Sequence, residues 1–151
     1  MKESYTQTVY YQLRLTAKYL NIFSNQMFAK ISADVSFDEF IVLDILNTEG
    51  SMCQRDLAKL LLKDRANTGR IANSLCEKKY IKISVEEKNK RLVKNLVLTE
   101  SGKKNLMKIR KDVEPIVANV ESKIDKLEID KLTQLLKDCR EKIKEFVDIQ
   151  I

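Results

Sequence analysis

The chain has 151 residues, of which 44% are hydrophobic and 33% are charged, a composition typical of a single folded, soluble domain. It contains no histidine, so the most common general base and the most common metal ligand are both absent. Three glycines and three cysteines are too few for a phosphate-binding loop or a disulfide framework. We therefore expect a protein that is not an enzyme and that needs no cofactor or metal.

The sequence shows no membrane or secretion segment. No apolar run approaches the ~20 residues that are needed to cross a bilayer. The first residues, "MKESYTQTVYYQ", lack the apolar stretch and the cleavage site of a signal peptide. A cytoplasmic protein without a membrane partner is the expectation.

Positive charge is concentrated in the middle of the chain. Residues 51–104 hold 14 of the 28 lysines and arginines and 6 of the 22 acids, a local charge of +8, while the remaining residues carry −2. A basic centre between nearly neutral ends favours a module that faces a polyanion. Chance clustering of lysines is the alternative interpretation.

The first two helices follow from apolar spacing and a capping motif. Apolar residues recur at three- and four-residue steps from Val9 to Ile31, which predicts one amphipathic helix over residues 5–31. The sequence "SFDE", residues 36–39, has the form of a capping box and predicts a helix from Phe37 to about Asn47. Gly50 is expected to end that helix.

Two short helices are predicted next, joined by a tight turn. The stretch "SMCQRDLAKLLLKD" predicts a third helix whose inward residues are Leu57, Ala58, Leu60 and Leu61. Asp64 is expected to cap a fourth helix over residues 65–79, with a buried stripe of Thr68, Ile71, Ala72 and Leu75. Together they predict a helix-turn-helix.

The spacing of the apolar residues then changes from about 3.6 residues, as in a helix, to 2 residues, as in a strand. The segments "YIKISVE" and "LVKNLVLT" alternate as strands do, and "EKNKR" connects them, so a hairpin with a basic tip is predicted. Thr99 is expected to start a long helix that is interrupted or kinked near Pro115. Residues 124–149 then repeat apolar positions as a last helix.

These elements predict a mainly α (α+β) fold, a winged helix-turn-helix with long N- and C-terminal helices. So small a winged domain does not need three long amphipathic helices around it, so we expect the ends to pair with a second copy. Residues 1–34 and 103–151 are assigned to this helical dimerisation region, and residues 35–102 to the winged lobe.

The fourth helix has the side chains of a DNA-reading surface. Arginine suits guanine, asparagine suits adenine, and small residues allow close approach in the major groove. An ordinary solvated helix face, the alternative, would carry more Glu and Lys at i,i+4 spacing. With the wing directed at the minor groove, the predicted DNA-binding residues are Arg55, Arg65, Ala66, Asn67, Thr68, Arg70, Asn73, Lys88, Lys90 and Arg91.

From Ser36 onward the chain resembles the MarR family of bacterial transcriptional regulators. The resemblance rests on "SFDEFIVLDIL", "CQRDLAKLLLKDRANTGRIANSLCEKKYI" and "NKRLVKNLVLTESG". Arg91 matches the wing arginine of that family, and Leu98, Thr99 and Gly102 match its "LTxxG". Asn89 stands where an acid is usual, Tyr80 replaces a glycine, and the stretch from Arg91 to Thr99 is one residue longer.

The resemblance implies a homodimer, usually a repressor, that binds a pseudo-palindromic operator. We expect the helix at 65–79 to enter the major groove and the wing at 86–92 to reach the minor groove. The alternative function is a winged-helix protein–protein interaction module that binds an acidic partner through the same basic face.

Control by an effector or by oxidation is left open by the sequence. The family often binds a small anionic aromatic compound between its helices and its lobe, and Tyr10, Tyr11, Arg14 and Lys18 are the candidates here. Cys53 and Cys76 are candidates for redox control, since Cys53 is expected at a helix start beside Arg55. A structural role is the alternative for both thiols, and Cys139 is expected to be a packing residue.

Overall fold

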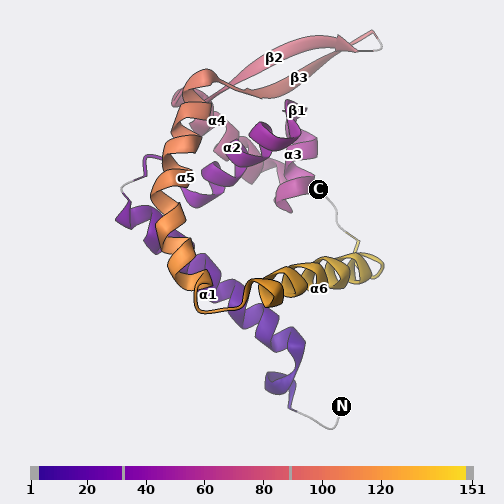
Figure 1. Ribbon diagram of the computed structural model, residues 1–151. Helices are drawn as coiled ribbons and strands as arrows, with labels where there is room; N and C mark the ends of the chain where they lie inside the picture. Colours follow the sequence, from indigo (N-terminus) through magenta and orange to yellow (C-terminus); the bar gives the residue numbers. More distant parts are fainter. Residues whose placement is uncertain (1–3, 32, 89, 149–151) are drawn as a thin grey trace.

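The computed structural model describes residues 4–31, 33–88 and 90–148 and is shown in Figure 1. In chain order its elements are a 3-10 turn η1 (Tyr5–Gln7), α1 (Val9–Lys30), α2 (Phe37–Glu49), β1 (Met52–Cys53), α3 (Gln54–Leu61), α4 (Arg65–Glu77), β2 (Ile81–Lys88), β3 (Arg91–Leu98), α5 (Glu100–Glu121) and α6 (Lys126–Lys144). The predicted winged helix-turn-helix fold, mainly α with a small sheet, is confirmed.

Three helix starts are fixed by the predicted caps. Ser36 accepts a hydrogen bond from the backbone N–H of Glu39, whose carboxylate accepts in return from the Ser36 N–H at 2.7 Å. Asp64 accepts from the Asn67 N–H at 2.7 Å, and Thr99 accepts from Gly102 at 3.0 Å. These bonds satisfy backbone donors that have no partner within the helix itself.

The sheet is antiparallel, with strand order β1-β3-β2. Its hairpin register runs without a bulge from Ile81 opposite Leu98 to Lys88 opposite Arg91. The connection is therefore only residues 89–90, shorter than the predicted "EKNKR". Asn89, where the family usually has an acid, falls outside the described residues, while Lys90 has a φ of 59°. Strand β1 was not predicted, because two residues are too short to show an alternating pattern.

The hydrophobic core lies within the lobe, where α2, α3, α4 and the base of the sheet meet. Val42, Leu43, Leu57 and Leu75 are completely buried there. The ends of α1 and α5 nearest the lobe join this core through Met27, Phe28, Leu106 and Ile109. The core therefore extends beyond residues 35–102 into both long helices.

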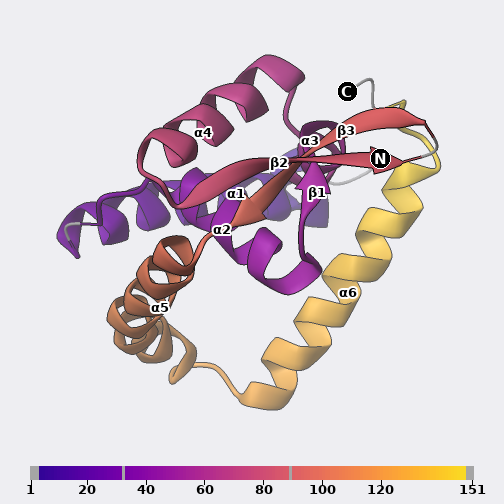
Figure 2. The same cartoon turned by 90° about the horizontal axis from the view of Figure 1, so that it is seen from above.

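The outer parts of the long helices, in contrast, lie largely in solvent. In Figure 1 α6 extends away from the lobe and is joined to the end of α5 by a short turn, and Figure 2 shows it along one side of the molecule. None of its described residues is buried, and Leu127, Leu132 and Leu135 are 78%, 54% and 55% exposed. Along α1, the apolar stripe that starts at Val9 is buried only near its C-terminal end.

Several predicted details of the helices are wrong. Leu60 was expected to face inward but is 56% exposed, because at 3.6 residues per turn it lies about 100° from the face that carries Leu57, Ala58 and Leu61. Of the two outcomes predicted near Pro115, an interruption or a kink, the interruption is absent, since α5 runs continuously from Glu100 to Glu121. The first helix begins at Val9, after the 3-10 turn, rather than at residue 5. The fourth helix ends at Glu77 instead of residue 79, where Lys79 takes a left-handed backbone conformation.

Candidate nucleic-acid interface

The outward face of α4 is the centre of the candidate interface. The helix has a buried face and an exposed face. Ala72 and Leu75 face the core, whereas Asn67, Arg70 and Asn73 are exposed. Arg65 and Ala66 in the first turn are exposed as well. The helix therefore presents two guanidinium groups and two amides around a slim centre, the combination that suits base edges in a major groove.

Thr68 requires a correction. It was predicted to contact DNA, but it is fully buried, and its hydroxyl donates to the backbone carbonyl of Asp64 at 2.9 Å. Thr68 and Ala72 are four positions apart, so they lie one turn apart on the same face of α4. Because Ala72 faces the core, Thr68 does as well. Thr68 therefore holds α4 to the core and does not face outward.

Three exposed side chains form a hydrogen-bonded chain along the outward face. The Arg70 guanidinium donates to the Asn67 amide oxygen at 2.7 Å, and the Asn67 amide nitrogen donates to the Asp64 carboxylate. Hydrogen bonds from the Asn67 backbone and side chain hold the pKa of Asp64 below its usual value. Asn67 thus orients Arg70, a role that the sequence pattern did not indicate.

The turn between α3 and α4 is held by Gln54. Its amide nitrogen donates to the backbone carbonyl of Arg65 at 3.1 Å. A Cβ atom on Gly69 would lie 3.1 Å from that same nitrogen, so the absence of a side chain there keeps the contact free of crowding. The angle between the two helices consequently depends on Gln54 and Gly69 together.

The wing supplies the second part of the candidate interface. Lys90 and Arg91 are exposed at its tip, as the prediction requires, while the predicted contact by Lys88 falls outside the described side chains. Arg55 on α3 is also exposed and lies 3.8 Å from the Asp56 carboxylate. Guanidinium and ammonium groups in these positions suit phosphates or a narrow minor groove.

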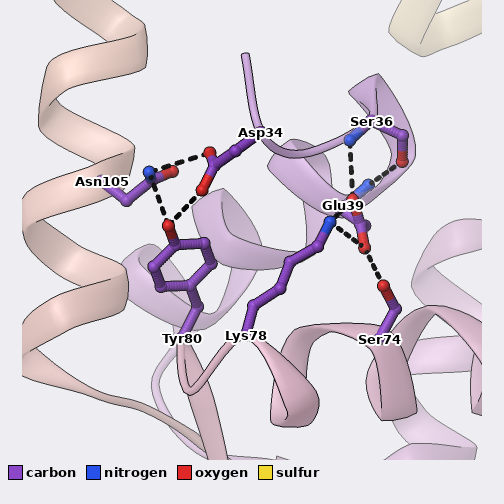
Figure 3. A network of polar contacts seen from close by, with 7 residues as sticks. All are labelled: Asp34, Ser36, Glu39, Ser74, Lys78, Tyr80 and Asn105. Carbon is purple, nitrogen blue, oxygen red and sulfur yellow. Dashed lines mark hydrogen bonds and ion pairs between the residues drawn. The ribbon is translucent and has the colours of Figure 1, made fainter.

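A partly buried ion pair fixes the far end of α4, as Figure 3 shows. The Glu39 carboxylate on α2 accepts from the Lys78 ammonium at 2.8 and 3.0 Å and from the Ser74 hydroxyl at 2.5 Å. Burial raises the pKa of Glu39, but the hydrogen bonds from Lys78 and Ser74 outweigh it and leave the pKa below its ordinary value. The sequence indicated Glu39 only as a helix cap, and nothing in it pointed to this long-range pairing.

A second polar group joins the base of the wing to α5 (Figure 3). The Tyr80 hydroxyl donates to Asp34, and the Asn105 amide donates to both Asp34 and Tyr80, at 3.0 and 3.1 Å. The hydrogen bond to Asp34 raises the pKa of Tyr80 to about 12. Three segments far apart in the sequence are thereby tied together.

The "LTxxG" residues have a structural explanation at this same junction. The Thr99 hydroxyl donates to the backbone carbonyls of Lys79 and Tyr80, at 2.8 and 3.0 Å. A Cβ atom on Gly102 would lie only 2.1 Å from the Tyr80 carbonyl, so glycine is required there. Both residues bring the start of α5 against the end of the helix-turn-helix.

The structure does not assemble the other candidate residues into a site within one chain. Tyr10, Arg14 and Lys18 are exposed on the outer part of α1, and none of the described cavities includes them or Tyr11. The Cys53 thiol donates to the Asp56 carboxylate at 3.1 Å. Burial raises the pKa of Cys76, which disfavours the reactive thiolate.

Two further classes of site were sought in the described part of the chain. It contains no group of three or more cysteine, aspartate or glutamate side chains placed to hold a metal ion. No helix among the same residues combines the length and the apolar character that crossing a membrane demands.

Comparison with solved structures finds the same fold in winged helix-turn-helix proteins that are transcriptional regulators. BpsR of Bordetella bronchiseptica, whose DNA binding is regulated by 6-hydroxynicotinic acid, matches with a TM-score of 0.77 and 18% identity over 93% of this chain and 98% of its own. MepR of S. aureus in complex with DNA matches with a TM-score of 0.73 and 20% identity over 93% and 99%.

A MarR/EmrR family regulator from Acinetobacter sp. ADP1 is similar too, with a TM-score of 0.78 and 22% identity over 95% of this chain and 99% of that one. No protein-family model matches the sequence, and no curated protein does. At these identities the likeness establishes the fold, which is that of the MarR family of transcriptional regulators.

Proposed function

We propose that the chain is a DNA-binding transcriptional regulator that acts as a homodimeric repressor on a pseudo-palindromic operator. The observation that carries the proposal is that α4 has two different faces. One face exposes Arg65, Asn67 and Arg70, and the other is buried in the lobe. The fold that it shares with MepR, a protein with a known DNA complex, supports the same function.

In the proposed mechanism, one set of side chains contacts the bases and another binds the DNA backbone. Arg65 and Arg70 contact base edges in the major groove, and Asn67 either reads adenine or keeps Arg70 in place. Arg91 enters the minor groove, while Arg55 and Lys90 bind phosphates. In a dimer, two such lobes would place their α4 helices about 34 Å apart, one turn of DNA.

We propose that the dimer forms through the predicted regions 1–34 and 103–151. Their exposed leucines support this, since exposed apolar patches often mark sites of protein–protein contact. The cluster of Tyr10, Tyr11, Arg14 and Lys18 stays a prediction of an effector pocket, which a second copy would have to complete. The regulation of BpsR by 6-hydroxynicotinic acid, a small aromatic acid, supports such an effector.

The test is a binding selection from genomic fragments followed by footprinting of the selected site. Arg65→Ala and Arg70→Ala should each reduce the preference for that site over random duplex by about 10-fold, the discrimination of one bidentate base contact. Arg140→Ala on α6 removes the same charge away from the lobe and should leave the preference unchanged. An unchanged preference in the two α4 variants, with equal binding to an acidic peptide, would favour the protein-interaction alternative.

A further inference from the structure

Asp64 uses its two carboxylate oxygens for two different tasks at the start of α4. Oδ1 accepts from the Asn67 backbone N–H at 2.7 Å and caps the helix. Oδ2 accepts from the side-chain amide nitrogen of the same residue, Asn67. Capping alone needs one oxygen, because Ser36 and Thr99 each cap a helix of this chain with a single hydroxyl. The second oxygen of Asp64 therefore makes a contact that a cap does not require.

The Asn67 amide can face its two neighbours in only one direction. A carboxylate can only accept hydrogen bonds, whereas a guanidinium group can only donate them. The amide nitrogen must therefore point to Asp64, and the amide oxygen to Arg70, whose Nη2 donates to it at 2.7 Å. The reverse orientation would set two acceptors together at one end and two donors at the other. Together with Arg70, Asp64 thus fixes the direction of an exposed amide.

Asn67 and Arg70 keep hydrogen-bonding capacity for bases while they hold each other. Arg70 gives only one of its N–H donors to Asn67 and keeps a pair for the O6 and N7 atoms of guanine. The Asn67 amide likewise keeps one N–H and one lone pair, the combination that adenine requires. The two side chains lie one turn apart on the exposed face of α4, so they can reach neighbouring bases.

The negative charge of Asp64 works against DNA binding in general. The carboxylate is exposed beside the face proposed to approach DNA, and hydrogen bonds from the Asn67 backbone and side chain lower its pKa, so it is charged at neutral pH. Phosphates of any DNA sequence repel such a charge. Asparagine and serine cap helices about as well as aspartate does. A carboxylate here therefore lowers the affinity for all DNA, and what it adds to a neutral cap is the fixed direction of the Asn67 amide.

We propose that Asp64 is a positioning residue that sets the base preference of α4 without touching DNA. It holds the Asn67 amide in the direction that matches adenine, and through Asn67 it holds Arg70 for a guanine. An amide that is free to rotate also turns its nitrogen alone to the acceptors of guanine or thymine, and so it discriminates less. This role rests on the proposed function, and it gives each half-site of the operator an adenine and a guanine at neighbouring positions.

Asp64→Asn tests this role, because asparagine keeps the cap but brings a donor to face the Asn67 amide. Binding of the full chain to a fragment from the genomic selection and to random duplex is measured at one salt concentration. The variant should prefer the selected fragment about 10-fold less than the parent chain does, the discrimination of one base contact. Its affinity for random duplex should rise about 2- to 5-fold, since one repulsive charge is removed. Weaker binding to both duplexes with an unchanged preference would show that Asp64 is only a cap.

Two comparisons separate positioning from charge and from folding. Glu77→Gln removes an equal charge from the exposed last residue of the same helix and should leave the preference unchanged. In the Asn67→Ala background, Asp64→Asn should no longer change the preference, because Asp64 acts through Asn67. Additive losses in the double variant would overturn the role. Asp64→Ser, which caps with a single hydroxyl, should show the same loss and replaces Asp64→Asn if that variant fails to fold.

The hydrogen bond itself can be tested without DNA. In NMR spectra of the free chain, the side-chain N–H groups of Asn67 should exchange with solvent more slowly than those of the exposed Asn73. The difference should vanish in Asp64→Ser and persist in Glu77→Gln, and equal exchange in the parent chain would overturn the geometry. If the difference is found but the DNA preference of the variants is unchanged, the positioning role is wrong. If the chain selects no DNA, the base preference fails with the proposed function, and the exchange rates still decide whether Asp64 holds the amide.

Discussion

The winged lobe and the outer helices have similar sequence patterns but very different surroundings. Leu57 and Leu75 of the lobe are fully buried, whereas Leu132 and Leu135 of α6, at comparable helical spacing, are more than half exposed. The lobe also contains the partly buried Glu39–Lys78 pair, while the ion pairs near the end of α6 join neighbouring turns in solvent. An amphipathic pattern therefore shows that a face is apolar, and only the fold shows what covers it.

The two regions are expected to be stabilised in different ways, one by burial within the chain and the other by contact with a second copy. The lobe buries its own apolar surface, so it should be stable at any protein concentration. The outer helices expose theirs, so their contribution should depend on a second copy and hence on concentration. The predictions below address the two regions in turn, starting with the largest effect.

Leu57→Ala should lower the free energy of unfolding by about 2–5 kcal/mol, because it leaves a cavity in a core that is completely closed to solvent. Denaturant unfolding at low protein concentration measures the change. Leu132→Ala on α6 is the matched control and should cost far less under the same conditions. Equal losses in the two variants would mean that α6 packs on its own chain.

Glu39→Gln should lower the free energy of unfolding by about 2 kcal/mol, because hydrogen bonds from Lys78 and Ser74 to a charged acceptor are replaced by weaker ones. The folded-state pKa of Glu39 lies below its ordinary value of 4.5, so its stabilisation is present above pH 4.5 and is lost as the pH falls through the folded pKa.

Unfolding measured as a function of pH checks the sign of this effect. The variant should lose the part of the acid dependence that belongs to Glu39, and its difference from the parent chain should shrink below pH 4.5. Glu49→Gln, at the exposed last residue of α2, is the control. A difference that grows on acidification would contradict the assignment.

Replacing Leu132 and Leu135 together by serine should raise the dimer dissociation constant at least 10-fold, which is about 1.4 kcal/mol, if these leucines meet a second copy. Sedimentation over a range of concentrations measures it. The same change should hardly alter unfolding of the dilute chain, since neither side chain is buried within it. A double variant that remains an equally tight dimer would refute the proposed interface, and Lys137→Ser serves as the control.

The smallest effect is expected for Leu60→Ser. This leucine is 56% exposed, so its replacement should change the free energy of unfolding by less than about 0.5 kcal/mol. Denaturant unfolding beside Leu57→Ala measures the contrast within a single short helix. A cost comparable to that of Leu57→Ala would restore the sequence-based prediction that Leu60 faces inward.

The sequence by itself determined the order of the elements and most of their starts. Ser36, Asp64 and Thr99 were identified as caps because capping depends on residues that are three positions apart at most. The hairpin was also predictable, because the alternation of apolar residues in a strand is visible over a few neighbouring positions. The exposed face of α4 was also predictable, since the helix has a clear inner and outer face once its start is known, while DNA recognition by that face stays a prediction.

Only the tertiary structure decided which residues far apart in the chain meet. The pairing of Glu39 with Lys78 and the contact of Asp34 with Tyr80 and Asn105 join elements that no local pattern connects. Thr68 was included in the DNA-facing set although its place on the buried stripe already opposed that role, and its burial settled the matter.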